Sequence, residues 1–233
     1  MSEIPYATAL IVGAGSGVSA SVARALARAG VRVALAARNV HKLDALVAEI
    51  DGRAFAADAA APESVAQLFA EVDASLGPPD LVLYNASGRL RGAIVDLDPH
   101  EVRKAMDVSA FGGFLTMQQA ARRMLPNRRG AILLTGATAS VKGFPLSSGF
   151  AMGKFGLRGL AQSAARELAP RGIHVAHFVI DSAVRSAARP DPAERPDSTL
   201  DPDAIAQTYL DVLRQPRSAW SWEVELRPWV ENF

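Results

Sequence analysis

Short hydrophobic runs alternate with segments of helical periodicity along nearly the whole chain. Uninterrupted apolar runs are typical of parallel strands that are buried on both faces, and apolar residues spaced three and four apart indicate amphipathic helices. The runs predict strands at residues 7–12, 31–36, 54–57, 81–84, 131–135, 174–180 and 223–226. The segments between them predict helices at residues 18–29, 42–50, 62–76, 99–125, 148–169 and 201–213.

This alternation predicts a single α/β domain, residues 1–233, whose parallel sheet carries helices on both faces. A glycine-rich break at residues 13–17 directly follows the first strand. Such a break favours the doubly wound, Rossmann-like architecture, in which a nucleotide binds where the first strand turns into the first helix.

Composition narrows the possible functions. The 233 residues, 49% of them hydrophobic, can bury a large core, and a net charge of +1 gives no general attraction to nucleic acid or to an anionic membrane. The chain has no cysteine, which excludes disulfides, thiolate catalysis and cysteine-based metal sites. Its four histidines are scattered, so we expect no metal site.

Hydropathy and the first residues bear on location. No stretch approaches the roughly 18 apolar residues of a membrane span. Only a short apolar run follows Glu3 and Pro5, without the pattern of a signal peptide. We therefore expect a cytoplasmic protein whose partner is a small-molecule substrate, not a membrane or a nucleic acid.

One segment differs from the rest in composition. Residues 186–203 contain four prolines among charged side chains and few apolar residues. Too little chain follows this segment to form a second domain, so it is interpreted as a loop and not as a linker. Because it follows the sixth predicted strand, beside the nucleotide-binding edge, we expect a mobile lid over the substrate pocket.

The break after the first strand carries the first candidate binding residues. Gly13 and Gly17 allow the backbone to turn tightly and to approach a pyrophosphate closely, with Ser16 between them. The helix that begins near Val18 offers free N–H groups and the positive end of its dipole. The alternative interpretation is a glycine-rich turn that binds no ligand.

The residue after the second strand bears on the choice of cofactor. An acidic side chain at this place would accept a hydrogen bond from the ribose 2′-hydroxyl of NAD and would repel a 2′-phosphate. The chain has Arg38 there instead, and an arginine can bind a 2′-phosphate through two hydrogen bonds. This favours NADP (NADPH) over NAD. The alternative is a solvated arginine at the start of the next helix.

Residues 143–154 read Gly-Phe-Pro-Leu-Ser-Ser-Gly-Phe-Ala-Met-Gly-Lys and resemble the catalytic segment of the short-chain dehydrogenase/reductase family. That family carries Tyr-x-x-x-Lys; Phe150 stands at the tyrosine position, while Lys154 is kept. Residues 12–19 are similar to its Thr-Gly-x-x-x-Gly-x-Gly motif, with Ser19 at the last glycine. The resemblance covers most of the chain and implies a seven-stranded sheet in the order 3-2-1-4-5-6-7.

The resemblance also implies further site residues. Asp58, after the third predicted strand, stands where the family contacts the adenine ring, or is a turn residue. Asn85 lies where the family has Asn-Asn-Ala-Gly after the fourth strand. Lys154 is expected to hold the ribose hydroxyls of the nicotinamide half, unless it is a solvent-facing helix residue. Counted back from Lys154, the family's catalytic serine falls on Ala137, with Thr138 one residue away as the alternative, and its helix asparagine falls on Ser109.

Three of the four catalytic positions are therefore altered, because Phe150 can neither donate nor accept a proton. One interpretation is an NADP(H)-dependent oxidoreductase, acting on a carbonyl or an enone, in which Lys154, Thr138, Ser148 or water delivers the proton. The other is a catalytically silent dinucleotide-binding protein that serves as a sensor or a scaffold.

The two longest predicted helices, 99–125 and 148–169, are rich in small residues such as Gly156 and Gly159, which permit close helix packing. The family pairs these helices between subunits, so we expect a homodimer or a homotetramer. The three tryptophans lie near the end of the sequence and predict either a second contact or closure of the monomer's core.

Overall fold

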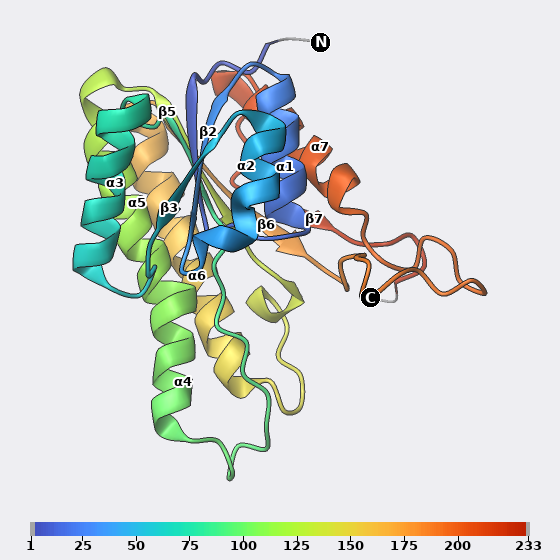
Figure 1. The fold of residues 1–233 in the computed structure, drawn as a ribbon. Coiled ribbons are helices and arrows are strands. Elements are labelled where there is room, and N and C mark those ends of the chain that lie inside the picture. The colour runs from blue at the N-terminus through green and yellow to red at the C-terminus, as the bar shows by residue number, and fades with distance from the viewer. Residues whose placement is uncertain (1–2, 232–233) are drawn as a thin grey trace.

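A seven-stranded sheet forms the centre of the computed structural model, which describes residues 3–231 (Figure 1). Its strands are β1 (Thr8–Val12), β2 (Arg32–Ala37), β3 (Arg53–Ala56), β4 (Leu81–Tyr84), β5 (Gly130–Thr135), β6 (Ile173–Ile180) and β7 (Glu223–Leu226). They lie in the order β3-β2-β1-β4-β5-β6-β7, and every neighbouring pair is parallel. The predicted fold and strand order are confirmed.

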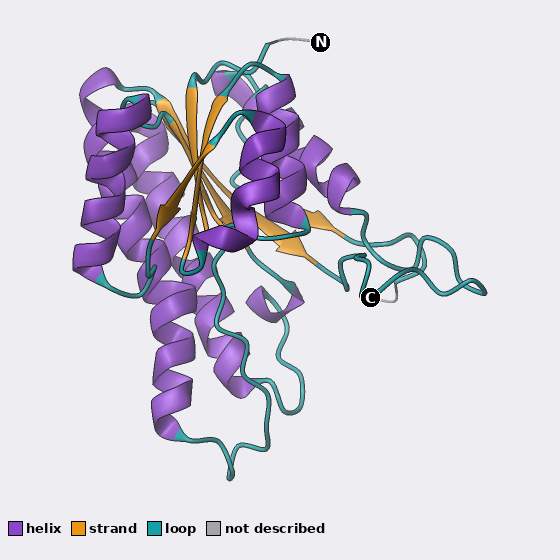
Figure 2. Cartoon of the chain, viewed as in Figure 1, coloured by secondary structure: helices purple, strands orange, loops and turns teal. Residues whose placement is uncertain are grey.

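Helices cover both faces of the sheet (Figure 2). They are α1 (Val18–Arg28), α2 (Asp44–Ile50), α3 (Pro62–Leu76), α4 (Pro99–Met106), α5 (Gly112–Met124), α6 (Ser148–Leu168) and α7 (Pro202–Leu213). One face packs against α1, α2 and α7, and the other against α3, α5 and α6. Within the described residues, no helix combines the length and the apolar character needed to cross a membrane.

The path of the chain defines where a ligand can bind. From β1 the chain runs to β2 and β3 on one side, then returns to β4 on the other side of β1. The strand order therefore reverses between β1 and β4. In doubly wound sheets, ligands bind beyond the carboxyl ends of the strands at this point.

Strands β1, β4, β5 and β6 are buried along their whole length, which explains their uninterrupted apolar sequences. Two histidines of β6 are polar although they are buried among apolar residues of the strand. His174 donates from Nε2 to the Ser221 carbonyl at 2.8 Å, and Nδ1 of His177 lies 3.1 Å from the Glu223 carboxylate. Burial lowers the pKa of His177 to about 4, although Glu223 opposes this shift. Both histidines thus fasten the segment around β7 to the sheet.

The helix predicted at residues 99–125 is interrupted. A π-helical turn, Asp107–Phe111, separates α4 from α5. The hydroxyl of Tyr84, at the buried end of β4, donates to the Val108 carbonyl within this turn. Gly112 makes room for that hydroxyl, because a Cβ on Gly112 would lie 2.4 Å from it. Packing against the end of β4 therefore accompanies the interruption, and helical periodicity alone does not indicate it.

Ion pairs and hydrogen bonds connect the two ends of the proline-rich loop, residues 186–203. Arg185 pairs with Asp191 at 3.0 Å and with Asp201 at 2.7 Å. Asp191 also accepts a hydrogen bond from the backbone N–H of Thr199 at 2.9 Å. These contacts join the end of β6 to the start of α7, and the mobility of the loop stays a prediction.

Two of the three C-terminal tryptophans pack within the protein, and the third is exposed. Trp220 stacks on His174 with ring centroids 4.7 Å apart, and Trp222 packs against the core. Trp229, by contrast, is 83% exposed. Closure of the monomer's core therefore explains two of these residues, and the exposed ring stays available for a contact.

Candidate functional site

Two cavities adjoin at the carboxyl ends of the central strands. The larger, about 700 Å³, lies beyond β5 and is called the β5 cavity. The other, about 560 Å³, lies beyond β2 and is called the β2 cavity. Four residues line both of them, Ser16, Asn85, Ser87 and Arg89. The two cavities together form one cleft across the point where the strand order reverses.

The β2 cavity brings together five of the predicted cofactor residues, two of which, Ser16 and Asn85, it shares with the β5 cavity. Gly13, Arg38 and Asp58 all line it, and Arg38 is exposed at its rim. Lys42 lines it as well, which the sequence analysis did not foresee. It adds a second positive charge to the wall that Arg38 lines, and positive charge in this wall suits a phosphate.

The glycine turn is built to bring backbone close to a ligand. Gly13 has a φ of +81°, and a Cβ on it would lie 2.3 Å from the backbone nitrogen of Ala86. Gly17, with a φ of +87°, precedes α1 without a side-chain cap. A Cβ on Gly15 or Gly17 would meet nothing within 4 Å. The outer side of the turn is therefore open, and the free N–H groups that begin α1 suit an anion there.

Asn85 is held in place beneath this turn. Its side-chain amide donates to the Ser19 hydroxyl at 2.7 Å, and that hydroxyl lies 3.3 Å from the Gly13 carbonyl, to which it donates. Ser19 is completely buried, so the serine at the family's last glycine position is a structural link and not a wall of the cleft. Ser16 lines both cavities, and Val18 lines the β5 cavity.

Ser87 is a site residue that sequence reasoning missed. Its hydroxyl oxygen is buried and has no hydrogen-bond partner among residues 3–231, and the residue lines both cavities. A buried hydroxyl without a partner is costly, so a bound ligand is the natural partner for it. The signal in the sequence was the serine itself, which lies two residues after Asn85 where the family has glycine.

Lys154 lies in the wall of the β5 cavity and is only 3% exposed. Its Nζ donates to the Thr135 carbonyl at 2.8 Å. Burial, and after it the positive charge of Arg89, lower the pKa of Lys154 to about 8. The solvent-facing alternative is therefore wrong, and the amine can both hold a ligand and exchange a proton near neutral pH.

Phe150 and Ala137 line the same cavity as Lys154, so two of the altered positions do meet there. Neither side chain has a polar atom. Thr138 and Ser147 also line the cavity and carry hydroxyls, whereas Ser148, considered from the sequence, is not among its lining residues. Lys154 is consequently a cationic proton donor in the same cavity wall as the altered pair.

Ser109 is the exception among the predicted positions. It is completely buried in the π-helical turn, and its hydroxyl accepts a hydrogen bond from the Gly88 N–H at 2.9 Å. Gly153 of α6 leaves space for it, because a Cβ there would lie 2.6 Å from the Ser109 Cβ. Ser109 lines neither cavity, so it anchors the loop after β4 instead of facing a substrate.

Comparison with known proteins identifies the family. A family model for short chain dehydrogenases matches residues 7–189. A crystal structure of a short-chain dehydrogenase from Rhodopseudomonas palustris is 35% identical, with a TM-score of 0.83 over 96% of this chain and 99% of that one. A metagenomic short-chain oxidoreductase, solved in complex with NADP, is 27% identical, with a TM-score of 0.84 over 95% and 97%. An uncharacterised oxidoreductase of Staphylococcus aureus is 28% identical over 98% of this chain and 100% of its own length. The chain therefore belongs to the short-chain dehydrogenase family.

The cleft fits the nicotinamide dinucleotide that this family binds. The open glycine turn suits a pyrophosphate, the Ser87 hydroxyl lacks a partner, and positive charge lines both halves of the cleft. Among residues 3–231, no three histidine, aspartate or glutamate side chains gather as metal ligands would. The backbone N–H groups of the turn, the Ser87 hydroxyl and the basic side chains are hydrogen-bond donors of the kind that a dinucleotide needs.

The buried amine of Lys154 leads to a prediction about stability. Its pKa is lower in the folded chain, about 8, than the ordinary value of 10.5, so the unfolded chain binds more protons between these two pH values. Stability should therefore rise with pH across this window. Lys154→Met removes the titrating group, and we expect it to raise the free energy of unfolding at pH 7 by about 2 kcal/mol, after the lost hydrogen bond is subtracted.

Chemical denaturation at pH 7, 8, 9 and 10 measures this effect. The difference between Lys154→Met and the natural chain should shrink as the pH rises from 8 to 10. Lys104→Met is the matched control, because the Lys104 side chain is 66% exposed, and it should change stability little at any pH. A Lys154→Met chain that is less stable by the same amount at every pH would contradict the argument.

Proposed function

We propose that this protein is an NADP(H)-dependent oxidoreductase that transfers hydride to or from a small carbonyl or enone substrate without a tyrosine acid. The observation that carries the proposal is Lys154, a buried ammonium in the wall of a cavity that adjoins the dinucleotide cleft. Burying a positive charge costs free energy because the charge loses its hydration, and a bound dinucleotide or a developing negative charge on the substrate would offset this cost.

Each half of the cofactor has candidate partners. Arg38 and Lys42 in the β2 cavity favour a 2′-phosphate, with Asp58 beside the adenine. Gly13, Ser16, Gly17, Val18 and Asn85 surround the pyrophosphate path, and Lys154 holds the nicotinamide ribose. When bound, the dinucleotide supplies or accepts the hydride. The NADP complex of the metagenomic relative supports the same preference.

Proton delivery rests on what the cavity retains. Phe150 and Ala137 offer no hydrogen bond, so the family's usual acid and its partner are absent from the wall. Lys154, with its pKa near 8, can donate a proton, and its charge together with that of Arg89 stabilises negative charge on a substrate oxygen. Reduction of an activated C=C suits this wall well, because the enolate needs electrostatic stabilisation before it needs a proton.

A second candidate function is a silent dinucleotide sensor or scaffold, and the apolar Phe150 is the observation that favours it. Transfer of deuteride from labelled NADPH to ketones and enones separates the two, since a sensor binds the dinucleotide and transfers nothing. In either case the loop of residues 186–203 is proposed as a lid, because Ser186 and Arg189 line the β5 cavity together with Phe150. Cytoplasmic location stays a prediction.

The cofactor preference is tested at Arg38. Arg38→Ala should weaken NADPH binding by about 1–3 kcal/mol, the range for hydrogen bonds to a charged group, and should leave NADH binding nearly unchanged. Calorimetric titration with both dinucleotides measures this. Arg53→Ala is the control, since Arg53 is exposed on β3 and lines neither cavity. Equal losses for NADPH and NADH in Arg38→Ala would remove the 2′-phosphate contact from the proposal.

The missing acid is tested by restoring it. Phe150→Tyr combined with Ala137→Ser should raise the rate of reduction of an activated ketone by about 10²-fold or more, within the range for general acid catalysis. The gain should disappear when Lys154→Met is added, because the lysine charge lowers the pKa of a neighbouring phenol. If the double variant binds NADPH normally and gains no activity, the cavity has diverged beyond these positions and the sensor function is favoured.

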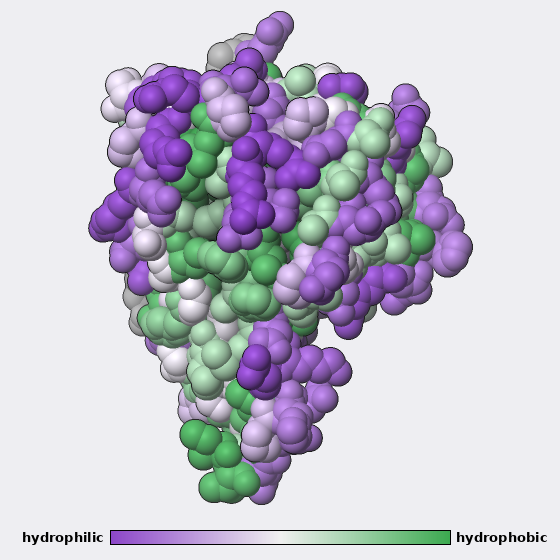
Figure 3. Space-filling model, turned by 90° about the vertical axis from the view of Figure 1, so that its left-hand side faces the viewer, coloured by the Kyte–Doolittle hydropathy of each residue, from purple (hydrophilic) through white to green (hydrophobic). Residues whose placement is uncertain are grey.

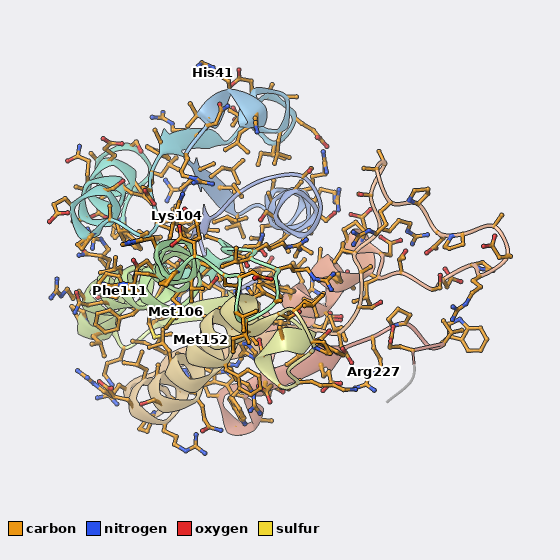
Figure 4. All side chains as sticks on the ribbon, turned by 90° about the horizontal axis from the view of Figure 1, so that it is seen from below. His41, Lys104, Met106, Phe111, Met152 and Arg227 are labelled. Atoms are coloured by element: carbon orange, nitrogen blue, oxygen red, sulfur yellow. The ribbon has the colours of Figure 1, made fainter. Side chains whose placement is uncertain are left out.

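The expected homo-oligomer has a candidate surface on α5, α6 and the π-helical turn. Phe111 and Phe114 are each 42% exposed, and on α6 Met152 is 49% and Phe155 44% exposed. Figure 3 shows apolar atoms in a band across the side of the molecule where α5 lies, and Figure 4 shows Phe111 and Met152 on neighbouring helices. We propose that a second copy covers these side chains.

Light scattering at micromolar concentration tests this surface. The natural chain should have the mass of a dimer or tetramer. Phe114→Glu with Phe155→Glu should shift it toward the monomer, because each buried aromatic side chain contributes about 1.5–3 kcal/mol. Val95→Glu, at an exposed apolar residue in the loop before α4, should leave the mass unchanged. A natural chain that is monomeric at these concentrations would rule the oligomer out.

A further inference from the structure

The wall of the β5 cavity carries charge of one sign only. Four arginines and Lys154 line it, and no aspartate or glutamate does. The whole chain is almost balanced, with 25 lysines and arginines against 24 acidic residues. Composition therefore does not explain the imbalance, and the fold has gathered basic side chains around this one space. The arginines are Arg89, Arg91, Arg185 and Arg189.

Only one of these arginines is neutralised by the protein itself. Arg185 forms ion pairs with Asp191 and Asp201 at the base of the lid loop. Within residues 3–231, the side chains of the other three arginines form no ion pair and no hydrogen bond. Three positive charges at the cavity are thus free to meet a ligand.

The proposed cofactor does not use all of them. Its 2′-phosphate is met by Arg38 in the β2 cavity, and its pyrophosphate by the glycine turn. Arg89 lines both cavities and lies close enough to Lys154 to lower the pKa of its amine, so we assign it to the place where the two cavities meet. Arg91 and Arg189 line the β5 cavity alone. They are left for the substrate.

We propose that the substrate carries an oxyanion, a carboxylate or a phosphate, beside its reacting carbonyl or enone, and that Arg91 and Arg189 bind this group. The inference rests on the proposed function and names its substrate class. A planar guanidinium with several N–H donors binds such oxygens through paired, charge-assisted hydrogen bonds. The apolar Phe150 and Phe144 in the same wall suit the remaining carbon skeleton.

Backbone hydrogen bonds hold the two separate segments that carry these arginines. Arg91 lies in the loop between β4 and α4, and the next N–H, of Gly92, donates to the Leu146 carbonyl at 3.0 Å. Arg189 lies in the lid loop, where its N–H and carbonyl each bond to Ser186 at 3.0 Å. An oxyanion bound by both would join the lid to the body of the protein, so substrate charge and closure of the lid are coupled.

Matched pairs of small probes test the inference. The first pair is 4-oxopentanoate and its methyl ester, and the second is dihydroxyacetone phosphate and dihydroxyacetone. Ligand-observed NMR titrations, with and without saturating NADP, give the affinities independently of turnover. We expect the anion of at least one pair to bind about 10-fold or more tightly than its neutral partner, with the difference falling as salt is added. The pair that shows the preference identifies carboxylate or phosphate.

Variants assign the preference to the two side chains. Arg91→Gln and Arg189→Gln should each weaken binding of the preferred anion about 10-fold, the lower end of the range for charged hydrogen bonds, and should leave the neutral probe unchanged. Arg195→Gln is the matched control, because Arg195 is exposed in the same loop and does not line the cavity. A loss as large in Arg195→Gln as in Arg189→Gln would overturn the inference, as would equal affinities within both pairs.

The same measurements distinguish this inference from the proposed function. Preferential anion binding without any deuteride transfer from labelled NADPH would keep the anion site and exclude the oxidoreductase. Deuteride transfer to neutral ketones or enones, with no preference for the anions, would keep the oxidoreductase and exclude the anion site.

Discussion

The close approach of two backbones, at Gly13 and Ala86, is the constraint on which the whole cleft depends. A Cβ on Gly13 would lie 2.3 Å from the Ala86 nitrogen, and the backbone of Gly13 has a φ of +81°. Glycine satisfies both conditions, and a residue with a side chain satisfies neither. Because the turn after β1 packs on the end of β4, the start of α1 faces the point where the strand order reverses. The two cavities share their lining there for the same reason.

The second dependence is electrostatic and centres on Lys154. Its ammonium is buried and, among the described residues, has one hydrogen-bond partner, the Thr135 carbonyl at 2.8 Å. A lysine has three donors, so two remain for whatever enters the β5 cavity. Beside it stand Phe150 and Ala137, which contribute shape and no charge. In the proposed function, Lys154 supplies the charge that holds the cofactor and stabilises negative charge, whereas the side chains of Phe150 and Ala137 have no group that could move a proton.

The distribution of charge links the proposed cofactor site to the proposed substrate site. At each end of the cleft are arginines that form no ion pair among the described residues, Arg38 at one end and Arg91 and Arg189 at the other, with Arg89 lining both cavities. Long flexible cations at a rim attract anions before contact and bind them after closure. The acidic residues near the lid, Asp191 and Asp201, are already occupied by Arg185. They hold the loop in place and leave the positive wall uncompensated.

Local sequence pattern was enough to predict the strands, the helices between them and the glycine turn, and the family resemblance implied the strand order. Helix α3 and strand β7 have the bounds that the periodicity indicates. The side chains of a helix or a strand that face the core recur at a fixed spacing, so they leave a regular pattern in the local sequence. Gly13, Gly17, Arg38 and Lys154 were predicted from their places after the strands and in the family motifs, and all four line the two cavities. What only the tertiary structure decided are the relations between distant segments. The π-helical turn follows from contact with Tyr84, Ser109 is turned into the core, and Arg91 and Arg189 meet one cavity from two separate loops. No local pattern specifies these relations, because each depends on how elements far apart in the chain pack together.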